Sequence, residues 1–211
     1  MILFFGDSLT SAENNQFNGF VEKLKIKKYK NFGVSGTCIG DYSLYPVGDN
    51  TLIQLLYKKT KYIKKADKIV LEYGANDITS VLCGYTTLNK VKIDLVKCVD
   101  YIRQINPKAD IIFLTLGDNK QQMAEGQCRY INYDYLKYCR LYSLCDYLQW
   151  ITTYDKFELF VKEFIQNSSL YQAHTIPLIK LDSSEISADG IHPNDAGYEK
   201  LARYLKGKIL C

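Results

Sequence analysis

Residues 1–9 read Met-Ile-Leu-Phe-Phe-Gly-Asp-Ser-Leu, an apolar run that ends on a glycine and then presents a serine. An uncharged apolar run of this length is typical of a strand buried on both faces of a parallel sheet. Open α/β folds build their sites at the carboxyl edge of such a sheet, so Ser8 stands where a functional group is expected. Gly6, Asp7 and Ser8 are also common turn residues, and this stretch alone favours a simple turn.

Length and composition describe an ordinary globular protein. The chain has 211 residues, of which 47% are hydrophobic and 24% are charged. The net charge of +4 comes from 27 basic and 23 acidic residues spread along the sequence, so no nucleic acid partner is expected. The 7 cysteines are an odd number without a Cys-x-x-Cys pair, which indicates reduced thiols instead of a disulfide framework or a zinc site.

The apolar N-terminus does not have the pattern of a signal peptide, because no basic segment precedes it and it stops at Phe5. No stretch approaches the length of a transmembrane helix. We therefore expect no membrane span and a cytoplasmic location. The oligomeric state cannot be inferred from these features.

Short apolar runs alternate with stretches of helical periodicity along the chain. Strands are expected at residues 1–5, 29–34, 68–73 and 110–116, with a weaker last or edge strand at 176–181. Helices are expected near residues 17–26, 51–63, 88–105, 128–149 and 156–166, and after a cap at Asn194 or Asp195. This alternation predicts a parallel sheet with helices on both faces.

No linker or repeat divides the chain, so residues 1–211 are expected to form a single domain. The regular pattern loosens at about 117–185, where an aromatic-rich helical elaboration is expected. Trp150 could form a hinge or a cap there, although packing in the core is the favoured interpretation of these aromatic residues.

A serine hydroxyl becomes a nucleophile when a histidine, itself held by a carboxylate, takes its proton. The chain has 2 histidines. His174 has no acidic residue within five positions, whereas Asp189 precedes His192 by three and a short loop could bring the two side chains together. Acyl transfer also needs donors for an oxyanion. Gly36 and Asn76 follow successive predicted strands and are expected to face the same crevice as Ser8.

Four short motifs occur in order along the chain: Gly6-Asp7-Ser8-Leu9, Asn31-x-Gly33-x-Ser35-Gly36, Gly74-x-Asn76-Asp77 and Asp189-x-x-His192. Together they resemble the four blocks of the SGNH hydrolase superfamily, also called the GDSL lipases and esterases. Each motif alone is weak, but the set spans residues 6–192. The segment 117–185 is longer and more aromatic than in compact members. The resemblance therefore predicts the catalytic chemistry but not the residues of the substrate pocket.

The resemblance implies a flavodoxin-like three-layer α/β/α sandwich with a parallel sheet of about five strands. It also implies a catalytic triad of Ser8, Asp189 and His192. The implied oxyanion hole consists of the main-chain N–H groups of Ser8 and Gly36 and the side chain of Asn76. Gly33 is a rival for Gly36, but the glycine after the serine matches the family pattern better.

These residues predict a serine esterase that works through an acyl-enzyme intermediate. The first choice of substrate is a small O-acyl group, such as acetyl, on a carbohydrate, and the alternative is a lysophospholipase or an acyl-thioester hydrolase. No cofactor or metal is expected. Asp189, His192 and Asp195 could be imagined as metal ligands, but no cysteine or second histidine lies nearby to complete a site.

A remote alternative is a flavodoxin-like binding domain without catalytic activity. Gly33, Gly36 and Gly40 invite comparison with loops that bind phosphate groups. Their spacing matches neither the dinucleotide fingerprint nor the P-loop, and no Gly-Lys-Ser/Thr follows. This alternative therefore rests on the expected fold alone.

Overall fold

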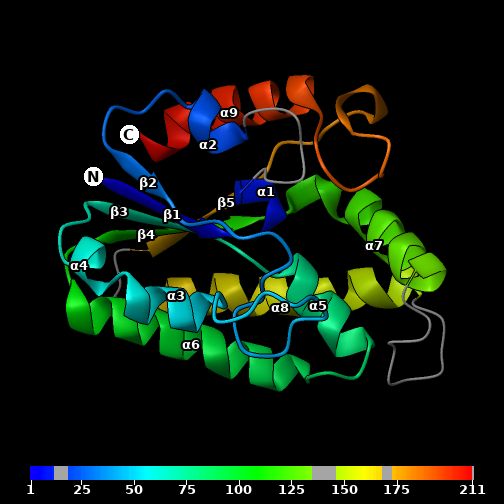
Figure 1. The fold of residues 1–211 in the computed structure, drawn as a ribbon, viewed down its shortest axis with the longest axis horizontal. Helices are drawn as coiled ribbons and strands as arrows, with labels where there is room; N and C mark the ends of the chain where they lie inside the picture. The colour runs from blue at the N-terminus through cyan, green and yellow to red at the C-terminus, as the bar shows by residue number, and fades with distance from the viewer. Residues whose placement is uncertain (12–18, 135–145, 168–172, 211) are drawn as a thin grey trace.

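A five-stranded parallel sheet forms the middle layer of the computed structural model, which describes residues 1–11, 19–134, 146–167 and 173–210 (Figure 1). Its strands are β1 (Ile2–Gly6), β2 (Tyr29–Asn31), β3 (Lys68–Glu72), β4 (Asp110–Thr115) and β5 (Ala173–Pro177). They lie in the order β2-β1-β3-β4-β5, and all neighbouring pairs are parallel. This is the flavodoxin-like order, and it confirms the predicted fold class.

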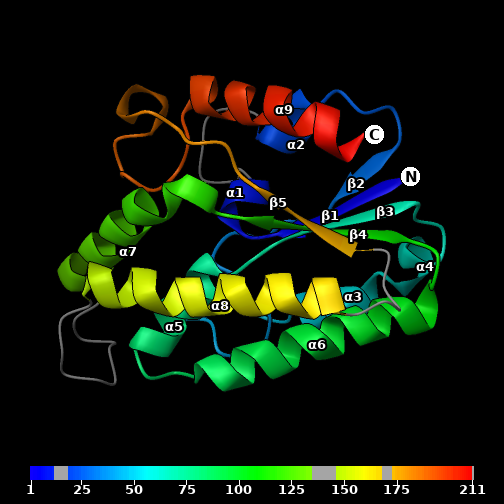
Figure 2. The same cartoon turned by 180° about the vertical axis from the view of Figure 1, so that it is seen from behind.

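Helices cover both faces of the sheet (Figures 1 and 2). One face carries α2 (Phe20–Lys23) and α9 (Asp195–Ile209). The other face carries α3 (Leu52–Lys58), α4 (Thr60–Ile63), α5 (Ala75–Leu82), α6 (Leu88–Ile105) and α8 (Tyr147–Asn167). Because β1, β3 and β4 lie between the two layers, their side chains are buried almost without interruption.

The carboxyl ends of the strands open on one edge of the sheet, where three further elements begin. They are α1 (Ser8–Ser11) after β1, the short 3₁₀ turn η1 (Gly117–Asn119) after β4, and α7 (Lys120–Asp134), which extends away from the sheet (Figure 1). A second 3₁₀ turn, η2 (Ser183–Glu185), precedes α9. This edge is where the predicted site residues are placed.

Two predicted helices differ in extent from the observed ones. The helix expected at 17–26 is limited to Phe20–Lys23 among the described residues, because Lys25 adopts the left-handed conformation with φ of 53°. The helix expected at 51–63 is split into α3 and α4 at Lys59. The Thr60 hydroxyl donates to the carbonyl of Tyr57 there, which competes with regular helical hydrogen bonding.

The outer strands also differ from the prediction. β2 ends at Asn31 instead of continuing to residue 34, although the N–H groups of Phe32 and Val34 still donate to the carbonyls of Phe4 and Gly6. The strand expected at 176–181 lies at 173–177. It is an edge strand, as predicted, and it ends at Pro177, which has no N–H to donate.

The predicted helix boundaries were wrong in the aromatic region. α7 begins at Lys120 instead of near 128, and α8 begins at Tyr147 instead of 156, while residues 135–145 of the predicted helix lie outside the described residues. Trp150 is therefore no hinge between helices. It is fully buried within α8, stacks on Tyr154 with ring centroids 5.3 Å apart, and donates from Nε1 to the Thr79 hydroxyl at 3.0 Å.

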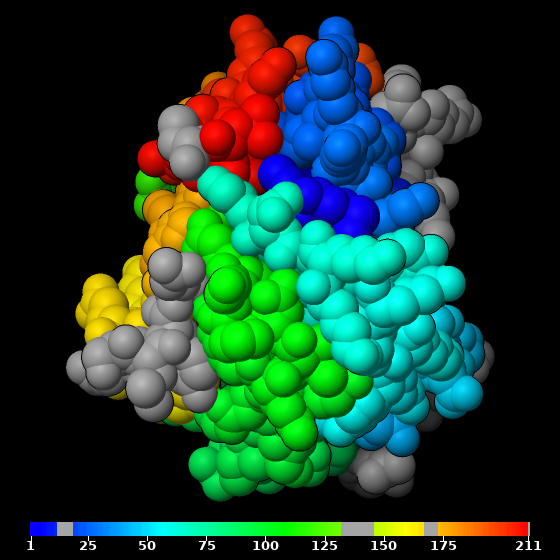
Figure 3. Space-filling view, turned by 90° about the vertical axis from the view of Figure 1, so that its left-hand side faces the viewer, coloured from blue at the N-terminus to red at the C-terminus, as the bar shows by residue number. Residues whose placement is uncertain are grey.

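The lysines are less evenly distributed in space than in the sequence. Lys30 lies 6.0 Å from the centre of the Tyr62 ring, and Lys59 lies 5.0 Å from that of Phe32. These two contacts join segments 23–32 and 57–68. These segments are adjacent on the face where the strands begin (Figure 3, blue and cyan). They contribute the exposed residues Lys25, Lys27, Lys28, Lys30, Lys58, Lys61, Lys64 and Lys65. The chain thus has a basic face on the side opposite Ser8.

Buried apolar side chains of the sheet and both helical layers form one connected core. Within the described ranges, no helix has the length and apolar character needed to cross a bilayer. Cys38, Cys83, Cys98 and Cys128 are buried, and the reduced state of the cysteines stays a prediction. The single domain, its elaboration at 117–185 and the cytoplasmic location stay predictions.

The substitution Trp150→Ala should lower the free energy of unfolding by about 3–5 kcal/mol, because it removes a fully buried indole and leaves a cavity. Leu159, which is 57% exposed on the same helix, provides the control, and Leu159→Ala should change stability by no more than about 0.5 kcal/mol. Urea unfolding at equilibrium measures both values. Equal effects of the two substitutions would contradict the packing role of Trp150.

Candidate active site

Ser8 is presented by a tight turn between β1 and α1. A Cβ atom at Gly6 would lie 2.1 Å from the Thr10 hydroxyl, so the close approach of α1 to β1 requires glycine at this position. The Asp7 side chain accepts a hydrogen bond from the N–H of Leu9 at 3.0 Å, which fixes the first turn of α1 around Ser8. The Ser8 side chain consequently lies at the carboxyl edge of the sheet, as the sequence predicts.

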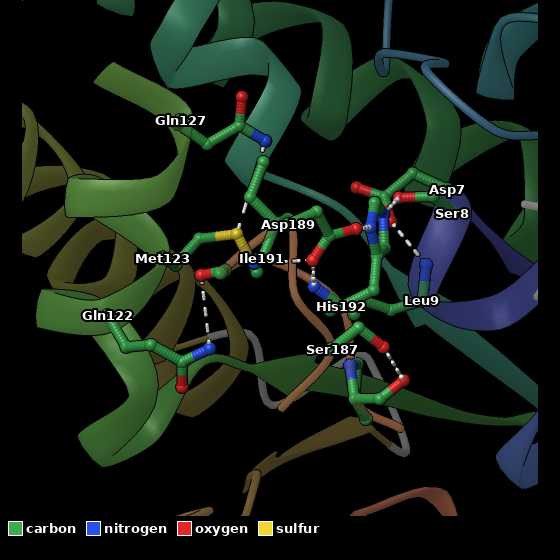
Figure 4. Close-up of polar contacts among 12 residues, drawn as sticks. Asp7, Ser8, Leu9, Gln122, Met123, Gln127, Ser187, Asp189, Ile191 and His192 are labelled. Atoms are coloured by element: carbon green, nitrogen blue, oxygen red, sulfur yellow. Dashed lines mark hydrogen bonds and ion pairs between the residues drawn. The ribbon is translucent and has the colours of Figure 1, made fainter. Parts of the chain in front are cut away.

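His192 and Asp189 reach Ser8 from the other end of the chain (Figure 4). His192 Nε2 lies 2.7 Å from Ser8 Oγ, and His192 Nδ1 lies 2.6 Å from Asp189 Oδ2. The second oxygen of Asp189 accepts the N–H groups of Ile191 and His192 at 2.9 and 3.0 Å. The structure thus brings together the three residues that the sequence singled out, and the loop itself holds the carboxylate against the ring.

The environment keeps Asp189 ionised. Partial burial opposes the charge, but hydrogen bonds from the His192 ring and from the N–H groups of His192 and Ile191 outweigh it and lower the pKa of Asp189 to about 2. A carboxylate beside Nδ1 favours the tautomer with a proton on Nδ1. Nε2 is then the acceptor that faces the Ser8 hydroxyl.

The other candidate positions lie elsewhere. His174 is on the edge strand β5, where its Nδ1 is 3.4 Å from Asp110 Oδ1 at the start of β4. Asp195, considered as a metal ligand, instead forms an ion pair with Lys23 at 2.6 Å. In the part of the chain that the structure describes, no cluster of three or more His, Cys, Asp or Glu side chains could hold a metal ion.

A pocket of about 300 Å³ opens beside Ser8, and both predicted oxyanion donors, Gly36 and Asn76, line it. Gly36 has φ of +75°, and a Cβ atom there would lie 2.9 Å from the Tyr45 ring. The rival Gly33 packs against α1 and donates its N–H to the Asn31 side chain. The geometry therefore favours Gly36.

Asn76 lies in the first turn of α5, directly after β3. Its Nδ2 atom is 3.1 Å from Asp7 Oδ2 and 3.2 Å from the carbonyl oxygen of Thr37. Both contacts use this amide, so an oxyanion that accepts from Asn76 would replace one of them. Ser8 and Asn76 follow β1 and β3, which flank the point where the strand order reverses and where such sheets form their sites.

Asp77, next to Asn76, anchors the loop that follows Gly36. Its Oδ1 atom accepts hydrogen bonds from the N–H of Ile39 at 2.9 Å and from the hydroxyl of Tyr42 at 3.1 Å. Burial raises the pKa of Asp77 to about 7, although both hydrogen bonds favour the charged form. This carboxyl therefore positions backbone and does not face the pocket.

Sequence reasoning missed most of the remaining pocket lining. Tyr45, Gln127, Tyr130 and Ile191 share the pocket with Ser8. The rings of Tyr45 and Tyr130 lie 6.5 Å apart at an angle of 41°. Gln127 and Tyr130 come from α7 and belong to no motif, so the only signal for them was the unusual aromatic content of this region.

Comparison with known proteins agrees with this site. The model of the GDSL-like lipase/acylhydrolase family matches residues 4–200, and the chain belongs to this family. Part of the chain, 146 residues or 68% of it, is 29% identical to a multidomain esterase from Ruminococcus flavefaciens. That match corresponds to only 16% of the relative's length.

Two solved structures show the same fold. One is a family two carbohydrate esterase from Clostridium thermocellum in complex with cellohexaose, with a TM-score of 0.65 and 17% identity over 99% of this chain and 62% of that one. The other is the lipase Lip_vut3 from a goat rumen metagenome, with a TM-score of 0.60 and 19% identity over 98% and 95% of the two chains. At these identities the likeness concerns the fold alone.

Replacement of Asp189 by Asn should lower kcat for ester hydrolysis by up to about 10⁴-fold, because the amide no longer enforces the tautomer with a proton on Nδ1. Asp155→Asn, which changes a half-exposed carboxylate paired with Lys120, provides a matched control and should leave kcat within about twofold. Steady-state kinetics on a soluble ester measure both. Full activity of Asp189→Asn would rule out its role beside His192.

Proposed function

We propose that this chain is a serine esterase that hydrolyses carboxylic esters through an acyl-enzyme intermediate. The observation that carries the proposal is the continuous chain of hydrogen bonds from Ser8 Oγ to His192 and on to Asp189, with distances of 2.7 and 2.6 Å. This arrangement supplies a nucleophile, a base and a group that orients the base. Membership in a family of lipases and acylhydrolases supports the same chemistry.

In the first half of the reaction, Ser8 Oγ attacks the ester carbonyl carbon while His192 Nε2 takes the hydroxyl proton. The carbonyl oxygen becomes an oxyanion, which accepts hydrogen bonds from the N–H groups of Ser8 and Gly36 and from the Asn76 amide. His192 then returns the proton to the leaving alcohol as the ester bond breaks. The acyl group is left on Ser8.

In the second half, His192 takes a proton from water, and the resulting hydroxide attacks the acyl carbon of the intermediate. Collapse of the second oxyanion releases the acid and returns the proton to Ser8 Oγ. Asp189 stays ionised throughout and stabilises the positive charge that His192 carries in both halves. No other group of the chain is needed to balance these steps.

The preferred substrate in this proposal carries a small acyl group, such as acetyl, on a carbohydrate. The pocket beside Ser8 has aromatic faces from Tyr45 and Tyr130 and an amide from Gln127, a combination suited to a sugar with apolar faces and polar edges. Similarity to a multidomain esterase and to a carbohydrate esterase bound to cellohexaose supports this choice.

A long acyl chain is less well accommodated. The apolar pocket next to Leu9 and Ile191 has a volume of only about 20 Å³, which is close to the space of one water molecule. A lysophospholipase or an acyl-thioester hydrolase therefore remains the second candidate, favoured by the likeness to a lipase. A binding domain without catalysis would have no use for a carboxylate-held histidine against Ser8.

The first test is labelling with a fluorophosphonate, which reacts covalently with activated serines. The wild-type protein should be labelled at Ser8, and Ser8→Ala should lose both labelling and at least about 10³-fold in kcat/KM. Ser35→Ala, which changes another serine of the same pocket, is the matched control and should retain labelling. Hydrolysis that survives Ser8→Ala would contradict the proposal.

The second test compares esters from acetate to palmitate. The value of kcat/KM should be highest for acetate and should fall by at least about 10-fold by octanoate, because the apolar pocket next to Leu9 has only about 20 Å³ and the pocket beside Ser8 is lined largely by polar residues. Acetylated xylo-oligosaccharides and vinyl acetate then distinguish the alcohol. Tyr130→Ala should raise KM for the sugar ester and leave that for vinyl acetate unchanged, whereas activity that rises toward palmitate would favour the second candidate.

A further inference from the structure

Two buried carboxyl groups lie side by side beneath Ser8. Gly6 of β1 is the register partner of Glu72, the last residue of β3, so Asp7 and Glu72 stand at neighbouring strand ends. Asp7 is 2% exposed and Glu72 is 3% exposed. A buried carboxyl is costly to ionise, and two neighbouring carboxylates that are both ionised would also repel one another. The triad uses neither group.

Asp7 connects the nucleophile to a predicted oxyanion donor. One oxygen of its carboxyl accepts the N–H of Leu9 at 3.0 Å, within the turn that presents Ser8. The other accepts from Asn76 Nδ2 at 3.1 Å, which sets the direction of that amide. Both contacts need an acceptor, so an ionised Asp7 satisfies them together.

Glu72 is placed to supply the proton that this arrangement lacks. Its carboxyl is hydrogen-bonded to that of Asp7 and accepts the Thr10 hydroxyl at 3.1 Å. Burial, followed by the negative charge of Asp7, raises the pKa of Glu72 well above its usual range. Burial also raises the pKa of Asp7, but the Leu9 N–H, the hydrogen bond from Glu72 and the nearby His192 oppose that increase. The proton therefore belongs on Glu72.

We propose that Asp7 and Glu72 are a pair of positioning residues that share one proton, in which protonated Glu72 donates to ionised Asp7 and Asp7 holds the Asn76 amide and the Ser8 turn in register. The pair acts through Asn76 and touches no reacting atom. The inference deepens the proposed function and rests on it for its kinetic consequences, whereas the shared proton itself is a property of the folded chain.

The other titratable groups near the pair come from several elements: Cys38 after β2, Tyr73 after β3, Asp77 of α5, Tyr154 of α8 and His192. Burial raises the pKa values of Cys38, Tyr73 and Tyr154 well above their usual range, so these three stay neutral at neutral pH. Asp77 is bound to Ile39 and Tyr42 and does not share the proton. Glu72 is thus the group beside Asp7 whose ionisation adds a second negative charge to the pair.

The sign of the pH dependence follows from the raised pKa of Glu72. Below that pKa, Glu72 keeps its proton and the pair carries one negative charge. As the pH rises through it, Glu72 ionises, the two carboxylates repel one another, and the Asn76 amide loses its fixed direction. The wild-type kcat should therefore decline on the alkaline side, while KM should change little because the ground-state ester makes less use of the oxyanion donors.

Two substitutions at Glu72 separate a positioning role from simple packing. Glu72→Leu removes the donor, and it should lower kcat by about 10- to 100-fold with little change in KM, since loss of one oxyanion donor costs about 10²–10³-fold. Glu72→Gln keeps an N–H donor toward Asp7 but cannot ionise. It should restore most of that kcat and should lack the alkaline decline that Glu72 causes.

Infrared difference spectroscopy tests the shared proton without any enzymatic activity. At neutral pH the wild-type protein should show the carbonyl absorption of protonated Glu72 together with that of the protonated fraction of Asp77, whose pKa is about 7, and Glu72→Gln should lose the Glu72 part. Glu158→Gln is the matched control, because Glu158 is also buried, at 5% exposed, but forms ion pairs with Lys120 and Lys162 at 3.3 and 3.1 Å. It should keep the absorption.

Absence of a protonated-carboxyl absorption in the wild type, or an absorption of unchanged intensity in Glu72→Gln, would overturn the inference. So would equal kcat values for Glu72→Leu and Glu72→Gln in an active, folded enzyme. If the absorption is present as expected but no ester is hydrolysed and Ser8 is not labelled, the proposed function fails and the shared proton stands. The two failures are thus distinguishable.

Discussion

A single hydrogen bond, 2.7 Å long, joins Ser8 to His192 across 184 positions of the sequence. For this contact to form, β1 must end inside the sheet, between β2 and β3, and the loop before α9 must return to the same edge. The parallel topology meets both requirements, because every strand ends on that edge. α9 packs on the same face of the sheet as α2 (Figure 1), and the loop before α9 brings His192 to Ser8.

The same edge gathers acidic side chains that water does not reach. Asp7, Glu72 and Asp77 are all at most 3% exposed, and hydrogen bonds to backbone or side-chain groups occupy each of them. Buried carboxyl groups lower stability unless they are paired, so their retention beside Ser8 fits a role in positioning. The exposed lysines at the opposite edge balance this charge over the whole chain but lie far from the site.

The sequence predicted much of this because strong local signals coincide with tertiary roles. The central strands are continuous apolar runs, and α6 was expected with its observed bounds because its apolar residues recur at three- and four-residue steps. Where local signals were weak, the predictions failed. The residues of β5 are mostly exposed or half-buried, so its apolar pattern is weak. α8 continues through Trp150, which packs against Tyr154 and against Thr79, a residue distant in the sequence.

The sequence by itself determined the order of the five strands along the chain, the motifs that follow β1, β2 and β3, and the choice of His192 over His174. These follow from hydrophobic periodicity and from residue types that backbone geometry and chemistry require locally. Only the tertiary structure decided that Gly36, not Gly33, lines the pocket, that α7 supplies Gln127 and Tyr130, and that Asp7 meets Glu72 and Asn76. The physical reason is that these relations depend on distances between segments far apart in the chain, which no local pattern encodes.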